Sequence, residues 1–177
     1  MGYSKLERNL IDLMKEEQAK LGYRKEAVRL YYPLSSLNHL FEAEDSVDAM
    51  QERLIHFPKD MTAKLGMLTV THKGDRFCFR IPEEGSEYVH KHMGANEFIK
   101  ELVEMLWQHG TTMEQIRALF DRHADGVICE NIDNGEFDYL LRFPESVGDP
   151  YYYCFKNEGC HIIYHRFLPE DYADFDF

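Results

Sequence analysis

Apolar and polar residues alternate along this chain with two different periods, and the period predicts where helices and strands form. Residues 28–32 and 68–81 carry the β-branched and aromatic residues that favour strands. Residues 82–94 are expected to be a connector that can include a helical turn. Apolar residues at helical spacing predict helices at about residues 4–21, 34–41, 46–57, 95–109 and 111–123.

Three local signals set the expected ends of these helices. Ser4 and Glu7 have the spacing of a capping box, which predicts the start of the first helix. Ser46 is expected to cap the helix that follows it, and Pro58 to end that helix.

The segment 68–81 has the clearest hairpin pattern in the chain. A two-residue turn at positions 74 and 75 would pair Val70 with Phe79 and His72 with Phe77. That register places the apolar side chains on one face of the hairpin, so we expect it to be the real one. The opposite, polar face would hold Thr69, Thr71, Lys73, Arg76, Cys78 and Arg80.

The last third of the chain predicts a sheet. Residues 136–167 contain three short runs of aromatic and β-branched residues, and turn-forming segments at 144–150 and 156–159 separate them. This pattern is typical of an antiparallel meander, with a further short strand expected near 127–130. The fold class is therefore α+β: a mainly helical N-terminal half with one β-hairpin, then two helices and an antiparallel β-meander. We expect domains at 1–93 and 94–177, which can also pack as one; the pattern leaves open whether the hairpin joins the meander.

Charge is distributed unevenly. The formal net charge is −12, of which residues 94–177 contribute −11 because they hold 6 basic and 17 acidic residues. An acidic half is repelled by phosphate backbones, so nucleic acid is not the expected partner. It suits an unidentified protein partner or a small ligand.

The cellular location is expected to be cytoplasmic. No apolar run is long enough to span a membrane, and the N-terminus lacks the apolar stretch of a secretion signal. The four cysteines are then expected to be free thiols. In the predicted hairpin at 156–159, Lys156 would face Cys160, and Cys154 and Cys160 would be diagonal neighbours.

No motif specifies a reaction. The chain has no nucleophile elbow, phosphate-binding loop or dinucleotide-binding glycine motif, so no catalytic residue and no cofactor is predicted. A weak metal site could combine His161 or His165 with Cys160 and residues of a neighbouring strand. His90 and His92 could chelate a metal together if their segment were extended.

Aromatic residues near the C-terminus are the candidates for binding a partner. Tyr151 and Tyr153 lie in a run of three tyrosines, which would place aromatic rings on both faces of one strand. Tyr172 and Phe175 alternate with acids in the tail 169–177, which is expected to dock on its own body or to reach a partner.

Two resemblances extend this picture. The order helix, strand, helix, turn, helix, hairpin over residues 4–81 resembles a winged-helix module, which implies DNA binding through the third helix. The residues 42–60 of that region hold six acids and two bases, the wrong balance for a phosphate-lined groove. The opening run, YSKLERNLIDLMKEEQAKLGYRKEAVRLYYPLSSLNHL, resembles an uncharacterised bacterial family of unknown function, which implies no activity.

The leading hypothesis is a cytoplasmic, non-enzymatic module that binds a protein partner or a ligand and has an acidic C-terminal half. The alternatives are a metal-assisted enzyme with a His, Cys and acid site near the C-terminal sheet, and a winged-helix DNA-binding regulator.

Overall fold

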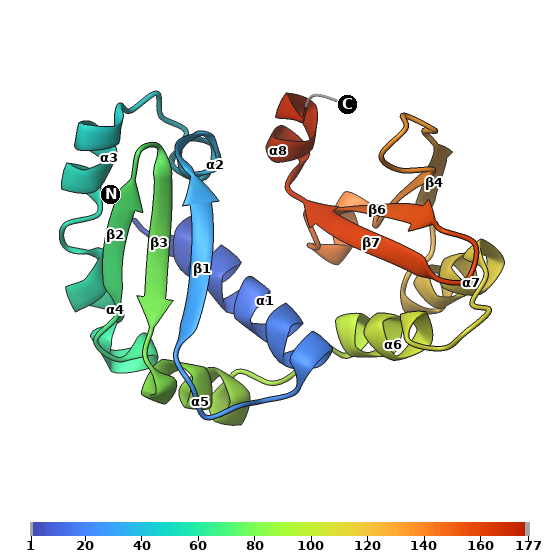
Figure 1. Ribbon diagram of the computed structural model, residues 1–177, viewed down its shortest axis with the longest axis horizontal. Helices are drawn as coiled ribbons and strands as arrows, with labels where there is room; N and C mark the ends of the chain where they lie inside the picture. The colour runs from blue at the N-terminus through green and yellow to red at the C-terminus, as the bar shows by residue number, and fades with distance from the viewer. Residues whose placement is uncertain (1, 176–177) are drawn as a thin grey trace. The chain divides into compact units, whose positions relative to one another are not determined.

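The computed structural model describes residues 2–175, which form two compact units, one running to Lys100 and the other beginning at Glu101 (Figure 1). Each unit contains helices and one antiparallel sheet, so the predicted α+β class is confirmed. The boundary between the units falls inside helix α6, Glu97–Leu106. The expected domain division at residues 93 and 94 stays a prediction.

The first unit has the element order predicted for residues 4–81 with one addition, since two helices, and not one, lie between the turn and the hairpin. The winged-helix resemblance stays a prediction. Its sheet has the strand order β1-β3-β2, so the hairpin forms a sheet with β1 and does not join the meander. In Figure 1 the three strands lie side by side, with α1 behind them. The elements are α1 (Ser4–Leu21), β1 (Val28–Pro33), α2 (Leu34–Phe41), α3 (Val47–Arg53), α4 (Phe57–Leu65), β2 (Thr69–Lys73), β3 (Arg76–Ile81) and α5 (Glu83–His92).

The core of this unit lies between the inner face of the sheet and the helices. Phe79 packs edge-to-face against both Tyr32 and Phe57, with ring centroids 5.3 and 5.8 Å apart. The hydroxyl of Tyr32 donates a 2.6 Å hydrogen bond to Oδ1 of Asn9 and so ties β1 to α1. Leu10, at full burial on α1, follows the predicted helical spacing.

The predicted hairpin register is confirmed: Val70 pairs with Phe79 and His72 with Phe77. Ser46 caps α3 as expected, since its hydroxyl accepts a 3.3 Å hydrogen bond from the amide of Ala49.

Three expectations about the helices of this unit were wrong. The first helix has its N-cap at Tyr3 with no side-chain cap hydrogen bond, so Ser4 is its first helical residue. Pro58 lies in the first turn of α4, where a proline's missing amide hydrogen costs no helical bond, so it begins a helix. The expected connector 82–94 is mostly helix α5. Within it Gly85 makes a close approach, because a Cβ there would lie 2.4 Å from the carbonyl oxygen of Leu65.

The second unit contains the predicted meander. It is a four-stranded antiparallel sheet in which every strand pairs with its neighbour along the chain. The helix Met113–His123 of this unit begins with a capping box formed by Thr112 and Gln115. Tail residues 169–174 form a helix that packs on β7, and residues 176 and 177 lie outside the described part. The remaining elements are α7 (Met113–His123), β4 (Ile128–Asn131), β5 (Tyr139–Arg142), the 3-10 turn η1 (Glu145–Val147), β6 (Tyr152–Asn157), β7 (Ile162–Phe167) and α8 (Pro169–Asp174).

An aromatic cluster joins α7 to this sheet. The ring of Phe120 lies 4.9 Å from that of Phe143 and meets Tyr153 and Phe155 edge-to-face, centroid to centroid at 5.2 and 6.1 Å. Phe120, Tyr153 and Phe155 are almost fully buried. These contacts form the core on which the meander rests.

The predicted turn between β6 and β7 was wrong by three residues. Lys156 pairs with Ile163 and Cys154 with His165, and the amide of Glu158 donates to the carbonyl of His161 across the loop. Cys160 is therefore in the loop while Cys154 is buried in the strand, so the two thiols are not neighbours.

Candidate functional site

Strand β2 is an edge of the three-stranded sheet, because it is hydrogen-bonded to β3 alone. A two-residue turn follows Lys73, so Lys73 and Thr71 exchange backbone hydrogen bonds with β3. Val70 and His72 alternate with these residues along the strand. Their backbone amide and carbonyl groups consequently point away from β3, to the open side of the sheet. These are the groups to which a further strand could pair.

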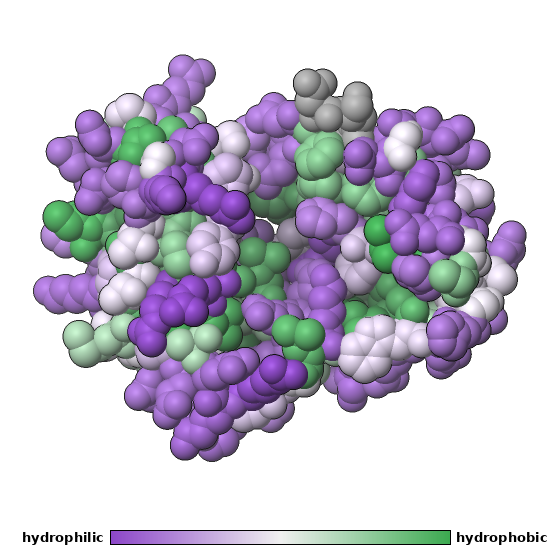
Figure 2. Space-filling model, in the orientation of Figure 1, coloured by the Kyte–Doolittle hydropathy of each residue, from purple (hydrophilic) through white to green (hydrophobic). Residues whose placement is uncertain are grey.

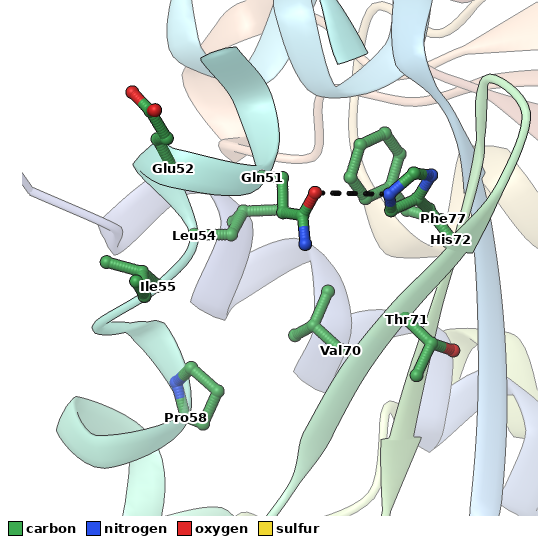
Figure 3. A pocket seen from close by; sticks show the side chains of 9 residues that line it. All are labelled: Gln51, Glu52, Leu54, Ile55, Pro58, Val70, Thr71, His72 and Phe77. Atoms are coloured by element: carbon green, nitrogen blue, oxygen red, sulfur yellow. Dashed lines mark hydrogen bonds between the residues drawn. The ribbon is translucent and has the colours of Figure 1, made fainter. Parts of the chain in front are cut away.

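A groove lies beside this edge, between β2 and the helices α3 and α4 (Figure 3). Its volume is about 320 Å³, at the lower end of the range for ligand sites. At one end, Gln51 Oε1 and His72 Nε2 lie 3.2 Å apart. Ile55 at its rim is 68% exposed, which is high for so large an apolar side chain. The lining residues are Gln51, Glu52, Leu54, Ile55, Pro58, Val70, Thr71, His72 and Phe77.

The outer face of the same sheet carries a different chemistry. In the register of the three strands this face has three rows: Arg29, Arg80 and Thr69; Tyr31, Cys78 and Thr71; and Pro33, Arg76 and Lys73. Four of these nine residues are basic and none is acidic. Figure 2 shows two strongly hydrophilic bands on the sheet, with less polar residues between them. We call this surface the basic face.

The arginines and the lysine of the basic face are exposed and lie close to one another. Arg29 is directly opposite Arg80, and Lys73 is directly opposite Arg76. None of the four forms an ion pair with another residue of the described chain. The guanidinium of Arg76 lies over the ring of Tyr31, 4.9 Å from its centroid, and that ring is 52% exposed.

The metal candidates near the C-terminal sheet are only partly brought together. Cys160 Sγ lies 3.1 Å from His161 Nδ1, and the other ring nitrogen of His161 lies 3.1 Å from Glu158 Oε2. The cysteine and the glutamate thus contact opposite sides of the imidazole and share no point where an ion could bind. His165 faces Cys154 across the strands and packs against Phe167.

The other histidine pair is separated by its helix. Residues two apart on a helix point in nearly opposite directions, so His90 and His92 on α5 cannot chelate one ion as an extended segment would. His90 stacks on Tyr23 with 4.2 Å between ring centroids, and His92 lies against Tyr88. Within residues 2–175, no group of three or more His, Cys, Asp and Glu residues could hold a metal ion.

The aromatic partner candidates lie mainly in the core of the second unit. Tyr151 and Tyr153 are buried, and their role in binding a partner stays a prediction. The hydroxyl of Tyr153 donates a 2.7 Å hydrogen bond to Asp149 Oδ2, and burial raises the pKa of this phenol well above its usual range. Tyr172 packs against Phe167, while Phe175 is 44% exposed.

Two features escaped the sequence reading. Arg29 and Tyr31 were not recognised as part of the basic face, although they alternate with apolar residues in the predicted strand 28–32. The groove beside β2 was also missed, because the predicted helix ended at Pro58 and α4, which forms part of the groove wall, was not expected.

Comparisons with known proteins add a family and no function. Residues 3–175 match the family described as "Domain of unknown function, E. rectale Gene description (DUF3877)", which confirms the suspected resemblance to a family of unknown function. No curated protein and no solved structure matches the chain. Among the described helices, none has the length and apolar character needed to cross a membrane.

Proposed function

The chain belongs to the DUF3877 family, whose function is unknown, and we propose that it is a non-enzymatic interaction module that binds an extended segment of a partner protein. The observation that carries this proposal is the free edge of β2 beside an apolar groove. The four cysteines are free thiols, which suits the reducing cytoplasm as its location.

Strand addition is the binding mode that this edge supports. The outward amide and carbonyl groups of Val70 and His72 provide hydrogen bonds that do not depend on the sequence of the partner. Selectivity comes from side chains, since alternate residues of an added strand point to the same face.

The groove provides the pocket for one such side chain. Leu54, Ile55 and Pro58 on the helical side face Val70 on the strand, so the lining favours an aliphatic or aromatic side chain. At the polar end, Gln51 and His72 offer hydrogen-bonding groups to the partner's backbone or to a polar side chain.

Selection from a displayed library of random nine-residue peptides tests the proposal. Peptides selected on the intact protein should carry apolar residues at alternate positions. Ile55→Glu places a charge at the groove, and Val70→Pro removes an outward amide without breaking a bond to β3. Both changes should weaken the selected peptides at least about tenfold in a fluorescence anisotropy titration.

Met67→Glu is the matched control, because Met67 is 81% exposed in the same unit and does not line the groove. It should leave peptide affinity unchanged. A library that yields no binder, or binders that ignore both groove variants, would rule out this binding mode.

The two alternatives remain weaker proposals. A metal-assisted enzyme would have to use the contact between Cys160 and His161, and the opposed position of Glu158 argues against a shared ion. DNA binding would use α3 and α4, where Asp48, Glu52 and Asp60 are exposed acids.

A further inference from the structure

The basic face is a second candidate interaction surface, and it does not depend on the groove. It gathers four of the chain's 20 basic residues on one open sheet face in a protein of net charge −12. Within the described residues, no carboxylate forms an ion pair with any of the four. A surface that keeps its cations unpaired in an otherwise acidic chain is suited to an anionic partner.

The arrangement of these cations is unfavourable for the folded chain alone. Directly opposed like charges destabilise a pair of strands, and this face has two such pairs, Arg29 with Arg80 and Lys73 with Arg76. Residues that lower the stability of the folded chain are expected where they serve a function. An anionic ligand that bridges each pair would remove the repulsion on binding.

The spacing of the two pairs defines the ligand. Arg76 and Arg80 are four residues apart on β3, which is about 13 Å at the rise of a strand. In an extended peptide, side chains at positions i and i+4 point the same way and have this same separation. Between the pairs lies the less polar row of Tyr31, Cys78 and Thr71.

We propose that the basic face binds an extended acidic peptide segment of a partner protein. Carboxylates at positions i and i+4 of the segment contact the two basic pairs, and an apolar side chain at i+2 lies over Cys78 and Thr71 of the middle row. Arginine is suited to this role because its planar guanidinium holds a carboxylate through two parallel hydrogen bonds.

A nucleic-acid strand fits the same face less well. Single-stranded nucleic acids bind sheets through several aromatic platforms on which successive bases stack. Tyr31 is the one aromatic side chain of this face, and the guanidinium of Arg76 already covers it.

The test uses the full chain and a fluorescein-labelled peptide of nine residues, with Asp at its third and seventh positions, Phe at its fifth and Thr elsewhere. One control peptide has Lys in place of Asp. Another has Asp at the fourth and sixth positions, which breaks the spacing. Ten-residue oligothymidylate serves as the nucleic-acid probe. The protein variants are Arg29→Glu and Arg80→Glu, with the exposed Arg24→Glu, outside the sheet, as the matched charge control.

The designed peptide should bind at least about tenfold more tightly than either control peptide, and both sheet variants should weaken it at least about tenfold. Arg24→Glu should leave its affinity unchanged. If the designed peptide bound Arg80→Glu as tightly as it binds the parent protein, the proposal would be overturned. Tighter binding of oligothymidylate than of the peptide would also overturn it. Ile55→Glu tests the groove separately, so failure of one surface is distinguishable from failure of the other.

Discussion

Reversing one charge of the Arg29–Arg80 pair should stabilise the protein. Two unit charges about 6 Å apart in water repel by about 0.7 kcal/mol, so changing one sign alters the free energy of unfolding by about twice that. At physiological salt, screening reduces the effect by roughly half. We therefore expect Arg29→Glu to add about 0.5 to 1.5 kcal/mol, depending on salt, and to raise the melting midpoint by several degrees.

A double-mutant cycle isolates this term from the strand preferences of the new residue. Arg29→Glu and Arg80→Glu should each stabilise the chain, whereas the double variant restores a like-charge pair and should lose the gain. Circular dichroism melts at 20 mM and 500 mM salt measure the effect, which should shrink at the higher salt. Arg24→Glu controls for the change in net charge. Strictly additive single effects, or a single variant that melts lower than the parent, would refute the cross-strand repulsion.

Three further changes test the packing. Gly85→Ala should lower the free energy of unfolding by about 1 to 3 kcal/mol despite the better helix propensity of alanine, because its Cβ would lie 2.4 Å from the Leu65 carbonyl oxygen and 2.5 Å from Ile81 Cγ2. Urea unfolding measures this loss. The control Glu84→Ala, at an exposed position of the same helix, should change stability by less than about 0.5 kcal/mol. Tyr153→Phe removes the hydrogen bond to Asp149 and should cost about 1 to 2 kcal/mol, a result that unchanged unfolding would contradict. The amide of Asn157 and the ammonium of Lys156 hold the pKa of Asp138 below its usual range, so this carboxylate stabilises the fold above about pH 4 and the contribution is lost as the pH falls through the lowered pKa. The difference in unfolding free energy between the parent and Asp138→Asn, about 1 kcal/mol at pH 7, should therefore shrink as unfolding is measured at successively lower pH below about 4.

The hairpin at 68–81 was predictable because its side chains leave one acceptable register. Shifting the pairing by one residue would bury Arg76 and Arg80 and expose Phe77 and Phe79. The helices 4–21 and 34–41 were predictable for a similar reason, since each has one apolar stripe that must face the core.

The helix α5 was missed because a glycine in a helical pattern ordinarily indicates a turn. Here Gly85 is required by the close passage of α4, which is a tertiary contact that no local pattern records. The hairpin between β6 and β7 has apolar residues on both faces of its strands, so more than one register satisfied the pattern and the wrong one was chosen. The basic face combines residues near positions 29–31 with residues near 69–80, and only strand pairing brings them together.

The pairing of β1 with β3 also sets the order in which the two sheets can form. The meander joins neighbouring segments, whereas Val28 must find Ile81, about 50 residues later. Closing so long a loop costs about 2 kcal/mol more than closing a tight hairpin, and distant pairings slow folding. At a synthesis rate of about 5 to 20 residues per second, the strand VRLYYP has no partner for several seconds after it is made. This aromatic segment is therefore where we expect a chaperone to bind the nascent chain, and where premature association between copies would begin.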